Sequence, residues 1–150
     1  QKLLVRSGSA VRGVQDLAGR RVCGAGDTPQ ASTQIQTILK LQPKAVPYML
    51  PTRADCLVAL QDHRVEAITT DGDMLAGMRK QDPNTELLRD PLAEKPAGIA
   101  ISHSHPEFVR FVNALLERMR ADGTWTGIYK RWIEPLSGEI VTPPSPVYRD

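Results

Sequence analysis

The sequence predicts an α/β fold with a parallel-rich sheet, followed by a pair of helices. Short aliphatic runs alternate with helical segments as far as residue 101, which is typical of βαβ units. Beyond that point the pattern changes to amphipathic helices. The 150 residues are 41% hydrophobic but only 5% aromatic, and repeated short aliphatic strands between helices give this profile.

Each expected strand is a short run rich in Val, Ile, Leu and Ala. The predicted strands are 3–5, 22–25, 44–50, 65–69, 85–88 and 97–101. A short helical turn at 14–18 and helices at 30–41, 53–61 and 71–80 fill the intervals. Asp27 or Thr28 is a natural N-cap for the helix at 30–41, and Pro29 suits the first position of that helix.

The C-terminal third predicts two more helices. Residues 106–121 carry apolar side chains at helical spacing, and Gly123 ends this pattern before a second helix at 124–133. Residues 137–150 are rich in proline and are expected to be irregular.

Composition narrows the function classes. The formal charge is +2, from 19 basic and 17 acidic residues, and such a balance argues against a nucleic-acid-binding surface. The sequence contains no uninterrupted apolar run of about 18 residues, so no membrane-spanning helix is predicted. The two cysteines, Cys23 and Cys56, fit either one disulfide or two core thiols.

Two strand ends carry polar residues suited to a zwitterionic ligand. In an open α/β sheet, ligands bind beyond the carboxyl ends of the strands. Asp27 and Thr28 follow one strand and open a helix, whose N-terminus attracts a carboxylate. Thr70 and Asp71 follow another, and the Asp71 carboxylate can pair with an ammonium group. The alternative interpretation is that Thr28 and Asp71 only cap their helices.

Motifs for catalysis, cofactors and metals are weak. The sequence has no nucleophile elbow, no dinucleotide fingerprint and no phosphate loop. Asp71 and Asp73 lack the distal glutamate of a calcium loop, and His103 and His105 have only Glu107 as an acidic neighbour. We therefore expect no catalytic residue, no metal and no cofactor.

Three segments resemble one known family. Residues 14–22 read VQDLAGRRV and resemble a V-x-D-L-x-G-K-x-V segment, and residues 55–71 resemble a helix and strand ending in Thr-Asp. Residues 108–132 resemble a terminal signature of V-N-x-x-L, D-G-T, I-Y and K-W. In this order, residues 1–134 are similar to family-3 solute-binding proteins of amino-acid ABC transporters. The two cysteines look like those of actinobacterial glutamine- or glutamate-binding lipoproteins.

The resemblance implies a type II periplasmic-binding-protein fold, in which two lobes joined by hinge strands close over the ligand. It implies a hinge strand at 1–8, the second lobe at 9–96 and a return hinge strand at 97–102. Residues 103–134 would be C-terminal helices of the first lobe, most of which is otherwise missing, and 135–150 a Pro-rich tail.

The resemblance also implies a site, a location and partners. Asp27 and Thr28 would contact the carboxylate of a polar amino acid such as glutamine or glutamate, while Asp71, with Thr70 beside it, would hold its amino group. The protein would be extracytoplasmic, anchored as a lipoprotein, with a Cys23–Cys56 disulfide. Its partner would be an ABC permease or a signalling membrane protein. The C-terminal helices would expose an apolar face without the first lobe, so either a longer parent chain was truncated or this face pairs with another copy in a homodimer.

Three departures from the family keep alternatives open. Pro29 has no N–H to donate, Asp27 replaces a glycine beside the expected carboxylate, and Ala97 replaces a tyrosine. A sensory or protein-interaction domain that has lost ligand capture is the main alternative. A dehydratase-like enzyme is the third hypothesis, and it would need a Glu or His base facing the cleft.

Overall fold

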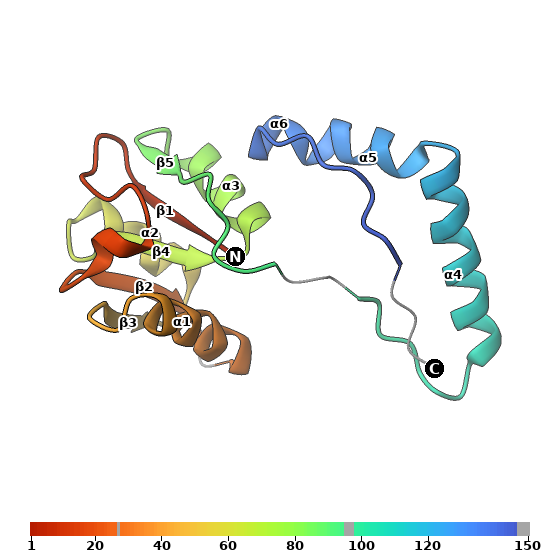
Figure 1. Cartoon of the computed structure of the whole chain (residues 1–150), viewed down its shortest axis with the longest axis horizontal. Coiled ribbons are helices and arrows are strands. Elements are labelled where there is room, and N and C mark those ends of the chain that lie inside the picture. Colours follow the sequence, from red (N-terminus) through yellow and green to blue (C-terminus); the bar gives the residue numbers. More distant parts are fainter. Residues whose placement is uncertain (27, 95–97, 147–150) are drawn as a thin grey trace. The chain divides into compact units, whose positions relative to one another are not determined.

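The chain forms two compact units, Gln1–Lys95 and Pro96–Asp150, in the computed structural model (Figure 1). The structure describes residues 1–26, 28–94 and 98–146. The expectations for Asp27 and Ala97 therefore lie outside the described residues.

A five-stranded sheet organises the first unit. Its strands are β1 (Lys2–Arg6), β2 (Arg21–Ala25), β3 (Val46–Leu50), β4 (Ala67–Thr70) and β5 (Thr85–Leu87). Their order is β3-β2-β4-β1-β5. Strand β2 pairs in parallel with β3 and β4, whereas β1 is antiparallel to both β4 and β5. Four strands thus share one direction and β1 alone runs against them, which confirms a parallel-rich sheet.

Each strand of the sheet's centre sends alternate side chains to opposite faces. Leu4, Cys23 and Ile68 lie in the core under α2 (Arg53–Gln61) and α3 (Gly72–Gln81). Their neighbours along the strands lie in a second core, together with η1 (Val14–Leu17) and α1 (Pro29–Leu41); these neighbours are Leu3, Val5, Val22 and Ala67. Both sheet faces are therefore covered, as a parallel-rich sheet requires.

Strand β3 forms although it contains proline. It lies at the edge of the sheet, where a missing N–H costs no bond to a further strand. Pro47 stands opposite Val22 in the pairing with β2. The predicted strand at 44–50 is thus confirmed in a shorter form.

Two covalent or steric features fix β2 against the helices. Cys23 of β2 and Cys56 of α2 form a disulfide with a Cα–Cα distance of 5.8 Å, and both residues are fully buried. On the other side, a Cβ at Gly24 would lie only 2.8 Å from Ile35 Cγ1 of α1. The glycine therefore allows α1 to approach the strand closely.

The described residues of the second unit are helical or irregular. They form α4 (Pro106–Ala121), α5 (Thr124–Trp132) and the short α6 (Glu134–Ser137). Residues 98–102 are not in a strand, so that part of the expected return hinge strand is wrong. A strand needs a hydrogen-bonded neighbour, and the described residues of this unit supply helices instead.

The apolar stripe of the second unit is open to solvent. None of the residues of α4, α5 and α6 is buried, and Phe108, Phe111, Ile128 and Trp132 are exposed. The Trp125 and Tyr129 rings stack at 5.3 Å along α5. Within the described part of the chain, no helix has the length and apolar content that crossing a membrane demands.

Candidate functional site

The candidate site lies at the carboxyl ends of β2 and β4, where α1 and α3 begin. Strand β4 ends at Thr70, and Asp71 is the N-cap residue of α3, with extended backbone angles. Its side chain makes no capping hydrogen bond to that helix. The interpretation of Asp71 as a simple helix cap is therefore wrong, and its carboxylate is directed to other partners.

Two glutamines of α1 hold the Asp71 carboxylate. Gln34 Nε2 donates to Asp71 Oδ1 over 3.0 Å, and Gln30 Nε2 donates to Oδ2 over 2.9 Å. Residues four apart lie on the same side of a helix, so both amides reach one acceptor. Gln34 is buried, with 4% of its surface exposed, whereas Gln30 is exposed.

Thr28 is the N-cap of α1. Its Oγ1 accepts a hydrogen bond from Ala31 N over 3.2 Å, and Pro29 occupies the first helical position. The capping interpretation thus holds for Thr28. Because Pro29 has no N–H and the Ala31 N–H is already bonded, Gln30 supplies the first-turn backbone donor that remains for a carboxylate.

The start of the chain is tied to the same corner. Gln1 Nε2 donates to Thr69 Oγ1 and to the carbonyl of Gln34, both over 2.8 Å. Thr69 Oγ1 in turn donates to the carbonyl of Lys2 over 3.1 Å. One buried hydrogen-bond network therefore joins β1, β4 and α1. It fixes the backbone segments that carry Gln34 and Asp71.

Thr70 does not join this network. Successive side chains of a strand alternate between faces. Thr69 points to the face that carries α1, so Thr70, with 5% of its surface exposed, lies on the face of α2 and α3. The structure brings Thr28 and Asp71 to one corner, sets Thr70 behind it, and does not describe Asp27.

Sequence reasoning missed Gln30 and Gln34. Glutamines on a helix are ordinarily taken for solvated surface residues. A signal was present, because they are spaced four apart and directly follow Thr28 at a strand end where ligands bind. That spacing places both amides where a carboxylate from the neighbouring strand can accept them.

Two surface hollows of the first unit lie elsewhere. One of about 310 Å³ runs between α2 and α3, and its lining includes Leu57, Met74 and Met78. Another of about 320 Å³ lies beside η1 and is lined in part by Leu3 and Leu88. Neither lining includes Thr28 or Asp71.

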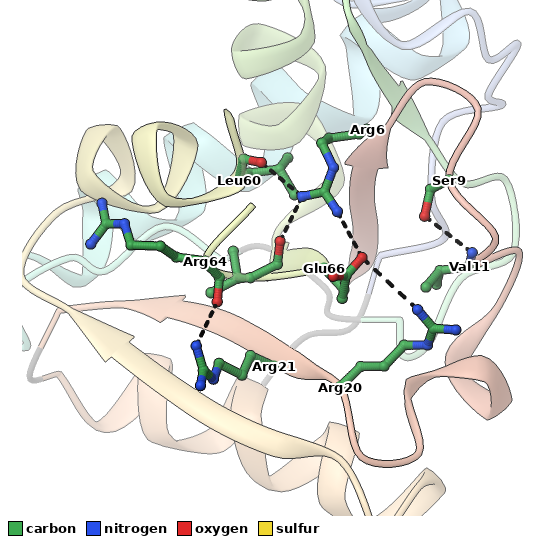
Figure 2. Close-up of polar contacts among 9 residues, drawn as sticks. Arg6, Ser9, Val11, Arg20, Arg21, Leu60, Arg64 and Glu66 are labelled. Carbon is green, nitrogen blue, oxygen red and sulfur yellow. Dashed lines mark hydrogen bonds and ion pairs between the residues drawn. The ribbon is translucent and has the colours of Figure 1, made fainter. Parts of the chain in front are cut away.

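An arginine network occupies the opposite end of the sheet (Figure 2). Arg6 Nη1 donates to the carbonyls of Leu60 and Val65, and its Nη2 contacts Glu66 Oε2 over 2.7 Å. Arg20 approaches the same oxygen at 4.0 Å. The Arg6 bonds close the end of α2 onto β1 and β4, so this network has a structural role.

No metal-binding cluster is present among the residues that the structure describes. No group of three His, Cys, Asp or Glu side chains has a suitable arrangement there. His105 Nδ1 lies 3.5 Å from Glu107 Oε1, and both side chains are largely exposed.

Known proteins similar to this chain are amino-acid-binding proteins. It is 33% identical over 135 residues to the ABC transporter glutamine-binding protein GlnH of Bacillus subtilis (strain 168), covering 89% of this chain and 48% of that protein. It is 31% identical over 133 residues to the glutamate-binding protein GluB of Corynebacterium glutamicum, covering 83% and 44%. The chain is homologous to the amino-acid-binding proteins of ABC transporters.

Similar solved structures show that this chain has the type II periplasmic-binding-protein fold. An ancestral arginine-binding protein bound to arginine matches with a TM-score of 0.69 at 23% identity, over 87% of this chain and 58% of that one. The ancestral amino-acid-binding protein AncCDT-1, a precursor of cyclohexadienyl dehydratase, matches with a TM-score of 0.68 at 24% identity, over 88% and 56%. No family model matches the chain.

The chain spans about half the length of the curated relatives that it matches. The matched GlnH protein aligns with most of this chain, including both of its units.

Proposed function

We propose that this chain is an extracytoplasmic domain that binds a polar amino acid, glutamine or glutamate in the first place. The observation that carries the proposal is the Asp71 carboxylate, which stands at the carboxyl end of β4 and does not cap its helix. Its chemistry suits the α-ammonium group, because a carboxylate and an ammonium form a charge-assisted hydrogen bond. The names of the relatives, which bind glutamine and glutamate, support the same ligand class.

The ligand carboxylate would lie at the start of α1. The N-terminus of a helix carries a partial positive charge and donors directed outward. In this proposal the backbone N–H of Gln30 and the hydroxyl of Thr28 contact the carboxylate, with Asp27 and Thr70 as neighbours of the two ends of the ligand. The proposal is capture and release of the ligand, without a catalytic role for these residues.

A sensory or interaction domain is the second candidate. The observation that favours it is the loss of anion donors at α1, since Pro29 has no N–H and the Ala31 N–H is bonded to Thr28. Such a domain would keep the fold and transmit a signal without holding a free amino acid.

The proposed partners follow from the relatives. Proteins that serve ABC transporters deliver their ligand to a permease, so we propose a permease or a signalling membrane protein as the partner, and a lipoprotein anchor as the means of attachment. We also propose that the exposed apolar side chains of α4 and α5, such as Phe111 and Trp132, pair two copies of the chain. Light scattering of the chain tests this, with a dimer expected and a monomer at all concentrations contradicting it.

Calorimetry tests the ligand proposal. The full chain is titrated with glutamine, glutamate, aspartate and asparagine, and saturable heat is expected with glutamine or glutamate. Absence of heat with all four, together with an unchanged melting temperature across the panel, would contradict amino-acid capture and support the second candidate. Glycine and acetate serve as controls for a bare zwitterion and a bare carboxylate.

A further inference from the structure

The two amides that hold Asp71 differ in their access to solvent. Gln34 is buried and its backbone carbonyl also accepts from Gln1, whereas Gln30, one turn earlier in α1, is exposed. The contact from Gln34 to Oδ1 is partly buried, and the contact from Gln30 to Oδ2 is exposed. One carboxylate thus has one sheltered oxygen and one oxygen on the solvent side.

Burial decides which amide can leave. If Gln34 released Oδ1, a buried N–H donor would lose its partner without gaining water, which is costly. If Gln30 released Oδ2, water would solvate both groups at once, so the net cost would be small. The hydrogen bond from Gln34 to Asp71 is therefore costly to break, whereas the hydrogen bond from Gln30 breaks at little cost.

An ammonium group that reaches Asp71 from solvent meets the oxygen that Gln30 already occupies. We propose that Gln30 is a displaceable competitor, which covers Asp71 Oδ2 in the free protein and moves off when an amino acid binds. Gln34 is a positioning residue that keeps the carboxylate oriented in both states. This inference rests on the proposed function, because it assigns Asp71 to the ligand ammonium.

Gln30 also connects the two ends of the ligand. Its backbone N–H is the first-turn donor that remains for a carboxylate, while its side chain covers the acceptor for the ammonium. A ligand with both groups therefore displaces the side chain and engages the backbone of the same residue. A simple amine would compete with the side chain but gain nothing from the backbone, so the arrangement favours α-amino acids over amines.

Calorimetry on the full chain tests the displacement, with whichever of glutamine and glutamate binds. Gln30→Ala removes the competitor, keeps the backbone N–H and favours the helix, so affinity is expected to rise about twofold to fivefold, as loss of a weak exposed hydrogen bond predicts. Gln36→Ala makes the same change at another exposed position of α1 and is expected to leave affinity unchanged. Unchanged or weaker binding by Gln30→Ala overturns the proposal.

Side-chain amide resonances in ¹⁵N-labelled chain follow the same event. On adding the ligand, the Gln30 amide signals are expected to move toward those of solvated Gln36, while the Gln34 signals keep their protection from exchange. Movement of Gln34 with a stationary Gln30 would overturn the assignment of roles. If wild type and Gln30→Ala both fail to bind any amino acid, the proposed function fails and the displacement fails with it. Binding by wild type without a gain in Gln30→Ala contradicts the displacement alone.

Discussion

Gln34 of α1 and Asp71 at the end of β4 are joined by a hydrogen bond of 3.0 Å between Nε2 and Oδ1. The two residues lie 37 positions apart in the chain, and their contact brings the starts of α1 and α3 to one corner of the sheet. The Asp71 carboxylate is thus directed toward α1 rather than onto its own helix.

Asp71→Asn is predicted to weaken glutamine or glutamate binding. The substitution keeps the size of the side chain but removes the charge that pairs with the ammonium, so affinity should fall about 10-fold to 100-fold. Calorimetry measures the change. Asp73→Asn is the matched control, because the Asp73 side chain is exposed and its Oδ1 accepts a hydrogen bond from the neighbouring backbone N–H of Met74. Equal affinity of Asp71→Asn and wild type would contradict the assigned role.

The disulfide between Cys23 and Cys56 is predicted to stabilise the first unit. It closes a loop across a sequence separation of 33, for which chain entropy predicts about 3–4 kcal/mol. Urea unfolding of the wild type should therefore shift to lower urea on adding a reductant. The double variant Cys23→Ala with Cys56→Ala should unfold at the lower urea concentration with or without reductant. If reductant does not shift the urea unfolding of the wild type either, the disulfide does not contribute to stability.

Arg6→Ala is predicted to destabilise the sheet end shown in Figure 2. The change leaves the carbonyls of Leu60 and Val65 without their Arg6 donor and removes the 2.7 Å partner of Glu66. Loss of partly buried charged hydrogen bonds of this kind costs about 2–4 kcal/mol in the free energy of unfolding.

Arg12→Ala is the comparison for that variant. Arg12 contacts Glu86 at 3.3 Å, but the two side chains are 64% and 45% exposed, so a cost of at most about 0.5 kcal/mol is expected. Chemical denaturation of both variants measures the difference. Equal losses would mean that burial and the two carbonyls do not set the value of the Arg6 contacts.

Gly24→Ala and Gly77→Ala are predicted to change stability in opposite directions. A Cβ at Gly24 would lie 2.8 Å from Ile35 Cγ1, and the overpacking should cost about 1–3 kcal/mol. Gly77 lies within α3 with no atom within 4 Å of such a Cβ, so alanine should add up to about 1 kcal/mol through its helix propensity. Thermal unfolding of the two variants gives the signs directly, and a stabilising Gly24→Ala would contradict the close approach of α1.

The order of strands and helices in the first unit was predictable because each element has a local pattern. The run Val22–Ala25 is short and aliphatic, and the helix after it has Thr28 as cap and Pro29 at its start. The direction of β1 was not predictable from its own residues, since pairing with β4 and β5 is set by partners far away in the sequence. The apolar run Gly98–Ile101 looks like a strand, but apolar residues alone do not supply the neighbour that a strand requires.

The site was predictable only in outline. Asp71 was predicted as a ligand-binding residue because a carboxylate at a strand end is unusual enough to suggest a ligand. Gln30 and Gln34 were missed because their importance depends on what lies opposite them across the sheet face, and spacing along one helix does not reveal an acceptor on another element. Thr70 stays a prediction, and what the sequence did not show is that the alternation of side chains along β4 turns it to the face opposite Thr69.

The place of β1 between β4 and β5 has a consequence for how the first unit folds. Both partners of the strand, β4 and β5, follow it far along the sequence, as the bond from Thr69 to Lys2 across 67 positions illustrates. Until β4 and β5 have formed, both edges of this apolar strand lack a hydrogen-bonded neighbour. Contacts of such long sequence separation make folding slow, and an unpaired apolar strand can associate with other chains in the meantime.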